Sequence, residues 1–166
     1  SASGYEITTI VCLQRVEFAL LAIEQFVNNA AKNNYLTNGT YRNPCLFRFV
    51  IGRGWGQGPS HSQSFETIFA QIPDINVFMP VFPHDSELIF KNFPLYNSPT
   101  ICLEHRWTHF SYDTQTSLMN TELTSYCVTK GNKLTVVCYS YNVLISNIVA
   151  NVFSKFDINL EVINLL

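Results

Sequence analysis

Short β-branched apolar runs alternate with segments of helical periodicity along this chain, and that alternation restricts the fold more than any other feature. Residues 9–13 (TIVCL) are predicted to form a buried strand, and residues 16–32 carry apolar side chains at helical spacing. The next predicted elements are strands at 45–51, 75–79 and 100–103, and helices at 62–72 and about 85–93. Strands joined through helices run parallel. We therefore predict an α/β fold, a three-layer sandwich around a mostly parallel sheet.

A second unit is predicted near the C-terminus. Residues 108–132 are rich in Thr, Ser, Asn and Tyr, which indicates a linker. Beyond it come a strand at 134–139, a helix at 143–156 and a strand at 160–165. This spacing is typical of a βαβ crossover, whose strands should be parallel and covered on both faces. The predicted organisation is a domain at 1–107, a linker at 108–132 and the start of a second domain at 133–166. An apolar run at the very end suggests a truncated or processed chain.

Composition and charge exclude several classes of function. Ten Lys and Arg against twelve Asp and Glu give a net charge of −2, without a basic run, so nucleic acid is not an expected partner. An aromatic content of 14% excludes intrinsic disorder. Only 13% of residues are charged, which suggests that part of the surface is buried against another subunit. No apolar run approaches the roughly 20 residues of a membrane span, so we expect no membrane association.

The cysteines favour a reducing compartment. Their number is odd, their spacings are wide and no C-x-x-C occurs; they stand at positions 12, 45, 102, 127 and 138. No secretory signal opens the chain. We predict reduced, buried thiols in a cytoplasmic protein.

The densest motif is residues 52–62 (GRGWGQGPSHS), which follow a predicted strand and precede a predicted helix. Four of the seven glycines fall here, and glycine permits unusual backbone angles or close approach to a ligand. The block lacks the lysine of a P-loop, the spacing of G-x-G-x-x-G and the final glycine of a nucleophile elbow. Glycine density alone therefore leaves a binding site and a surface loop equally open.

Two single residues are candidates for a site, and one histidine cluster is rejected. His61 lies at a strand-to-helix loop, where ligands gather in α/β sheets, although it could instead be a helix-start residue bonded to a nearby carbonyl. Phe18 follows the first strand, and its spacing alone favours a core aromatic. Glu104-His105 with His109 does not match the zinc motif H-E-x-x-H, so we predict no metal site there. Spacing alone supports a site built from two junctions, 14–18 and 52–62.

At these junctions the chain resembles the beta subunit of the thiamine-dependent 2-oxoacid dehydrogenase decarboxylating component, a family related to transketolase. The stretches that carry the resemblance are FALLAIEQ at 18–25, NAAK at 29–32, GRGWGQGPSHSQS at 52–64, IPDINV at 72–77 and EHR at 104–106. Residues 134–165 resemble the start of that family's C-terminal domain. The matches follow the expected order along nearly the whole chain.

The resemblance implies a pyrimidine-binding domain that opens the chain and roles for three residues. An aromatic at the Phe18 position packs against the aminopyrimidine of thiamine diphosphate, and the residue at Gln14 lines the same pocket. The histidine of the block, here His61, faces the reacting thiazolium and the substrate. An imidazole there can donate to a substrate oxygen or move a proton near neutral pH.

The resemblance also implies what the chain lacks. The family's cofactor-activating glutamate lies upstream of Ser1, and neither Glu6 nor Glu17 occupies its motif. The diphosphate and its Mg²⁺ are held by a Gly-Asp-Gly motif on a partner, the alpha subunit. A second beta subunit and the acyltransferase core of a multienzyme complex are the other implied partners. We therefore expect the isolated chain to bind the cofactor weakly and to be inactive. The alternatives are a transketolase-like ketol transferase, which should carry more basic residues, and a non-catalytic assembly module.

Overall fold

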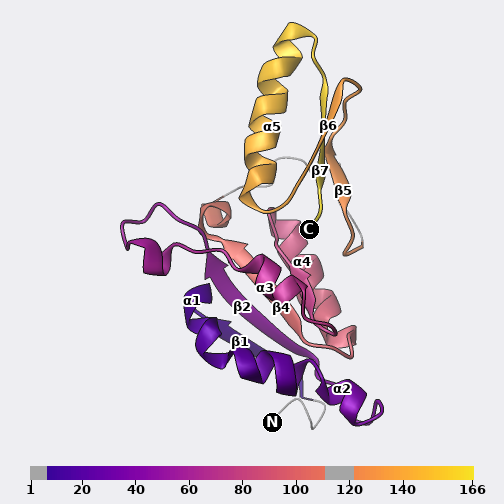
Figure 1. Cartoon of the computed structure of the whole chain (residues 1–166). Coiled ribbons are helices and arrows are strands. Elements are labelled where there is room, and N and C mark those ends of the chain that lie inside the picture. The colour runs from indigo at the N-terminus through magenta and orange to yellow at the C-terminus, as the bar shows by residue number, and fades with distance from the viewer. Residues whose placement is uncertain (1–6, 111–121) are drawn as a thin grey trace.

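The computed structural model describes residues 7–110 and 122–166, and its first part is an all-parallel sheet (Figure 1). The strand order is β1-β2-β4-β3. The strands are β1 (Thr9–Leu13), β2 (Cys45–Ile51), β3 (Asn76–Phe78) and β4 (Thr100–His105). The predicted bounds of β1 and β2 are confirmed, whereas β4 runs on to His105 because it stays paired with β2 as far as Ile51.

The predicted helix at 16–32 is a helical path that changes type along its length. It begins as α1 (Val16–Ala19), tightens into a 3-10 turn at Leu20–Ala22 and widens into a π-helical turn at Gln25–Ala30. Beyond the predicted helix, α2 (Asn33–Leu36) adds another helical turn. The remaining helices of this part are α3 (Glu66–Ala70), shorter than predicted, and α4 (Pro83–Asn92). Short 3-10 turns lie at Pro59–His61, Phe93–Leu95, Arg106–Phe110 and Ser154–Phe156.

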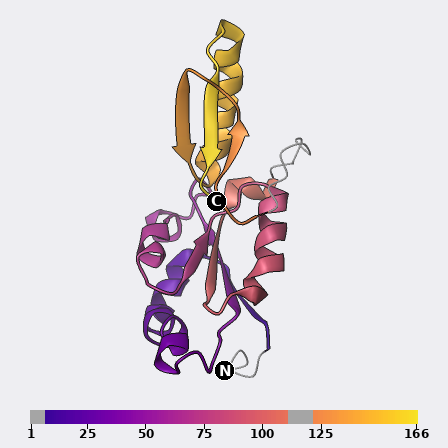
Figure 2. The same ribbon diagram turned by 90° about the vertical axis from the view of Figure 1, so that its right-hand side faces the viewer.

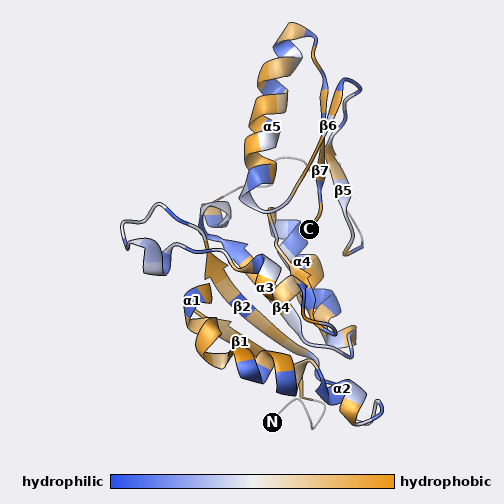
Figure 3. Cartoon of the chain, viewed as in Figure 1, coloured by the Kyte–Doolittle hydropathy of each residue, from blue (hydrophilic) through white to orange (hydrophobic). Residues whose placement is uncertain are grey.

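Helices cover both faces of the first sheet, so the predicted three layers are confirmed (Figure 2). On one face an aromatic cluster joins the sheet to the helices; its members are Phe26, Phe47, Phe49 and Phe69, with the Phe26 and Phe47 rings 4.8 Å apart. On the other face α4 packs Ile89 against Leu46 and Cys102. Figure 3 shows the strands as mostly hydrophobic, as a sheet buried on both faces requires.

A second, three-stranded sheet lies beyond the carboxyl ends of the first (Figures 1 and 2). Its order is β5-β7-β6, built from β5 (Tyr126–Thr129), β6 (Leu134–Cys138) and β7 (Leu160–Asn164). The predicted crossover is confirmed: β6 and β7 are parallel and α5 (Tyr141–Phe153) joins them.

Two expectations about this unit are wrong. Residues 126–129 of the predicted linker form β5, because they pair antiparallel with β7, while 111–121 lie outside the described residues. The second sheet is also covered on only one face in the described chain: α5 packs on Val162 and Leu160, and Val137, which points to the opposite face, stays exposed. The proposed domain boundaries themselves stay a prediction.

Two properties of the chain complete the description. All five cysteines are free thiols, as predicted, although only Cys45 and Cys102 are fully buried and Cys12 is exposed. Within residues 7–110 and 122–166, no helix has both the length and the apolar character needed to cross a membrane.

Candidate active site

The structure brings the two predicted junctions together at the carboxyl ends of β1 and β2. Arg15, which precedes α1, donates from Nη1 to the carbonyl oxygen of His61 over 3.1 Å. Glu17, in the first turn of α1, accepts at Oε1 from the backbone N–H of Gln63 over 2.7 Å. Both contacts join residues 46 positions apart in sequence. The juxtaposition that the two motifs predicted is therefore present in the fold.

His61 and Phe18 face one another across this contact. Their ring centroids are 5.8 Å apart at 81°, an edge-to-face arrangement. Phe18 is 48% exposed, so the interpretation of this side chain as a core aromatic is wrong. Gln14 is exposed at the end of β1, beside the same junction. An exposed aromatic face can stack against a flat heterocycle, and the imidazole beside it can exchange a proton with a group of that heterocycle or its substrate.

Hydrogen bonds hold the His61 backbone and ring. Its carbonyl also accepts from Trp55 Nε1 at 2.9 Å, and its Nδ1 lies 3.0 Å from the Ser60 hydroxyl. The guanidinium of Arg15 lies 4.7 Å from the Trp55 ring centre, a cation–π contact that fixes both donors. Arg15 and Trp55 thus fix the backbone carbonyl of His61, and Ser60 contacts the imidazole itself.

Two of the four glycines of the block let the backbone approach aromatic rings closely. Gly52, with φ 113°, would place a Cβ 2.7 Å from Nε2 of His105. Gly54, with φ 92°, would place one 2.5 Å from the Trp107 ring. Neither distance is tolerated by a real side chain. The block is therefore a loop that also takes part in a pocket: Gly52 and Gly54 make room for His105 and Trp107, and both of these rings line that pocket.

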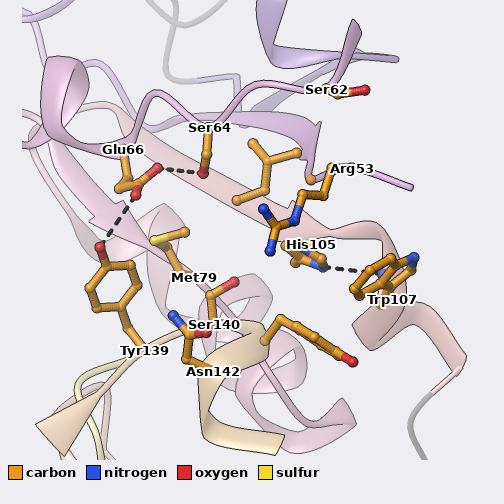
Figure 4. Close-up of a pocket in the computed structure, with 13 residues that line it drawn as sticks. Arg53, Ser62, Ser64, Glu66, Met79, His105, Trp107, Tyr139, Ser140 and Asn142 are labelled. Carbon is orange, nitrogen blue, oxygen red and sulfur yellow. Dashed lines mark hydrogen bonds between the residues drawn. The ribbon is translucent and has the colours of Figure 1, made fainter. Parts of the chain in front are cut away.

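Sequence reasoning missed this pocket. It has a volume of about 320 Å³ and lies where the glycine-rich block and the end of β4 meet the residues that begin α5 (Figure 4). The His105 ring stacks on Tyr141 at 5.0 Å and 13°. Burial, together with the charges of Arg53 and His109, lowers the pKa of His105 below its usual range. The available signal was the strand-to-helix junction at Tyr139–Asn142, the same kind of junction that identified residues 14–18.

Glu104, which stood beside His105 in the rejected zinc motif, is engaged elsewhere. Arg48 donates to both of its carboxylate oxygens, at 2.6 and 2.7 Å, and His109 Nε2 lies 3.2 Å from Oε2. His105 turns away from this pair to stack on Tyr141. Across the part of the chain that the structure describes, no three His, Cys, Asp or Glu side chains gather in a way that could hold a metal ion.

Solved structures place the fold among transketolase-like proteins. A split-gene transketolase, an inactive beta4 tetramer, superposes with a TM-score of 0.75 at 15% identity, covering 98% of this chain and 50% of that one. Transketolase from Campylobacter jejuni gives 0.73 at 14% identity, covering 96% of this chain and 24% of that one. No protein-family model matches the chain.

Curated relatives define the family. The pyruvate dehydrogenase E1 component subunit beta of Saccharomyces cerevisiae, a mitochondrial protein, is 30% identical over 162 residues, which is 94% of this chain and 44% of that protein. The corresponding subunit of Rickettsia bellii is 29% identical, over 94% of this chain and 49% of that protein. A 2-oxoisovalerate dehydrogenase subunit beta from Bacillus subtilis is 31% identical over 63% of this chain and 32% of its own length. The chain belongs to this family of 2-oxoacid dehydrogenase E1 beta subunits, and spans about half the length of the first two relatives.

Proposed function

We propose that the protein containing this chain is the beta subunit of a thiamine-diphosphate-dependent 2-oxoacid dehydrogenase, and that residues 14–18 and 52–62 form the pyrimidine side of its active site. The observation that carries this proposal is the edge-to-face pair of Phe18 and His61, held at 5.8 Å where two strand ends meet. Family membership gives the reaction class, oxidative decarboxylation of a 2-oxoacid.

The described residues fit one end of the cofactor and not the other. Phe18 offers an open aromatic face to the aminopyrimidine, with Gln14 beside it for polar contact. A diphosphate with Mg²⁺ needs carboxylate and amide oxygens, and no cluster suited to a metal occurs in 7–110 or 122–166. The proposal therefore assigns the diphosphate and Mg²⁺ to a partner, the alpha subunit.

His61 is the residue we propose to act on the reacting groups. Thiamine diphosphate, when bound, supplies the carbon nucleophile and electron sink for decarboxylation. The imidazole, oriented by Ser60 at Nδ1, can present Nε2 to a substrate oxygen and hold or deliver a proton there. Arg15 and Trp55 fix the carbonyl of His61 and so act as positioning residues.

The proposed assembly contains the alpha subunit, a second beta subunit and the acyltransferase core of a multienzyme complex. The sparse charge of the chain supports extensive contact with partners. The predicted cytoplasmic location stays a prediction, since curated relatives include mitochondrial as well as bacterial proteins.

The test is His61→Ala in the complete beta subunit, reconstituted with its alpha subunit. Loss of a positioned acid–base group should lower kcat by roughly two to four orders of magnitude. Cofactor affinity and Tm should change little, because the proposed hydrogen bond forms to the reacting substrate. Gln71→Ala, at an exposed residue outside both junctions, is the matched control and should keep normal turnover. Turnover within tenfold of the parent, or unfolding of the variant, would show that His61 is a structural residue.

A further inference from the structure

The residue before α5, Ser140, lines the 320 Å³ pocket and has a hydroxyl without a hydrogen-bond partner in the described part of the chain. Ser140 is the N-cap of this 13-residue helix, yet its side chain makes no capping hydrogen bond. Ser140 is only 5% exposed, and its hydroxyl has no partner among residues 7–110 and 122–166. A serine at this position ordinarily satisfies a first-turn N–H, and buried hydroxyls are ordinarily paired. The N–H of Val143 already donates to the carbonyl oxygen of Ser140 over 3.0 Å, so the Ser140 hydroxyl is the group that a ligand can pair with.

The charges around the pocket favour a single negative charge. Arg53 and Ser140 reach into it from opposite sides (Figure 4), and the positive end of the α5 dipole adds to the guanidinium. Glu66 also lines the pocket, and both its oxygens already accept hydrogen bonds, from Ser64 at 2.6 Å and from Tyr139 at 3.3 Å. A monoanion can pair with Arg53, whereas a dianion meets stronger repulsion from Glu66.

One wall of the pocket is aromatic. His105 lies parallel to Tyr141, and Trp107 packs on the same tyrosine at 4.8 Å and 73°. Burial lowers the pKa of His105 below its usual range, which favours the neutral imidazole in this wall. A pocket of this volume is at the lower end of the range for small-molecule sites. The wall suits an apolar, preferably flat, carbon body.

We propose that this pocket is a second site, which binds a small organic carboxylate. The carboxylate lies between the guanidinium of Arg53 and the hydroxyl of Ser140 at the N-terminus of α5. Its carbon body lies on the ring of Tyr141. The planar fork of arginine matches a carboxylate in two parallel hydrogen bonds, which gives the pairing its specificity. The pocket shares Arg53 and Ser62 with the glycine-rich block, but neither Phe18 nor His61 lines it, and the proposal does not rest on the role proposed for that pair.

Calorimetric titration of the purified chain tests the proposal, with benzoate as the probe. Benzoate should bind and uncharged benzamide should not. Inorganic phosphate should bind at least about tenfold more weakly than benzoate, because of Glu66. Arg53→Gln should weaken benzoate binding by about tenfold or more, as expected for the loss of a charge-assisted pair. Arg42→Gln, at an exposed arginine before β2, is the matched control and should leave the affinity unchanged.

Ser140 has two test variants, because its backbone φ is 56°. Ser140→Gly removes the hydroxyl while accepting this φ, and Ser140→Ala removes it with a side chain kept; each should weaken binding by roughly three- to tenfold. Circular dichroism checks that each variant is folded, and the glycine variant decides if the alanine variant is not. Equal binding of benzamide, tighter binding of phosphate, or full affinity in folded Arg53→Gln or Ser140→Gly each overturns the proposal.

Discussion

The two sheets of this chain differ in how completely their faces are covered. The first is packed by helices on both sides, and the side chains of its central strands, β2 and β4, are all buried or half-buried. The second has α5 on one side only, and this helix with the 3-10 turn that follows it leaves an apolar stripe exposed, which includes Ile148 at 60% and Phe156 at 72%. The difference teaches that the first unit buries its own core, whereas the second offers apolar surface to a partner.

The largest effect is expected in the aromatic core of the first unit. Phe49 is 1% exposed and packs on Phe26, Phe47 and Phe69. Phe49→Ala should lower the free energy of unfolding by about 3–5 kcal/mol, measured by urea denaturation. Val162→Ala is the matched change in the second unit and should cost about 2 kcal/mol. A larger loss at Val162 would reverse the contrast between the units.

Cysteine labelling compares the units without a mutation. Burial raises the pKa of the Cys45 thiol to about 11 and raises that of Cys102 further. At pH 8 the thiolate fraction of Cys45 should be about 100-fold below that of an ordinary thiol. Iodoacetamide followed by mass spectrometry should therefore label exposed Cys12 first, then Cys127 and Cys138 of the second unit, and the two buried thiols last. Labelling of Cys45 as fast as Cys138 would contradict the difference in burial.

The exposed stripe of α5 should make the purified chain self-associate. Its members recur at helical spacing and carry no charge; on α5 they are Ile145, Ile148, Val149, Val152 and Phe153, and Phe156 continues the stripe in the 3-10 turn that follows the helix. Ile148→Glu combined with Phe156→Glu should weaken association about tenfold, measured by sedimentation velocity. Leu21→Glu, which changes an exposed leucine of the first unit, should have no such effect. Equal effects of the two changes would mean that the stripe is not a distinct surface.

The smallest effect concerns the junction between the units, where burial lowers the pKa of His105. A lowered pKa means that the unfolded chain binds more protons as the pH drops below about 6.5. The stability associated with neutral His105 is thus complete above that pH and is lost as the pH falls through the folded pKa. Tm measured from pH 7.5 to pH 5 should therefore fall more steeply in the parent than in His105→Gln. Identical profiles would show that this imidazole does not titrate with folding.

Local patterns predicted the four strands of the first sheet and β6 and β7 of the second, because each of these is a compact apolar run. The bounds of β1 and β2 follow directly from TIVCL and CLFRFVI. β5 escaped prediction because Tyr126–Thr129 is a short run inside a polar segment and is stabilised by pairing with β7, more than 30 residues later. Local spacing cannot report such a partner.

The candidate site was predictable in part for the same reason. Two strand-to-helix junctions placed His61 and Phe18 at one sheet edge, and the structure agrees. Their spacing could not show that Phe18 is exposed, since exposure depends on what packs above α1. The pocket beside α5 depends on contact between His105 and Tyr141, 36 residues apart, which no local pattern contains.

The seating of His105 and Trp107 against Gly52 and Gly54 constrains how this protein can diverge. The ring of His105 or Trp107 occupies the space that a Cβ would fill at Gly52 or Gly54. A larger residue at either glycine would therefore require a change at the ring that faces it. Removing the ring is not a sufficient answer, since a backbone φ of 113° or 92° still penalises any L side chain. Replacement of either glycine alone should therefore be selected against. Variation at these two contacts is expected at His105 and Trp107, with both glycines retained.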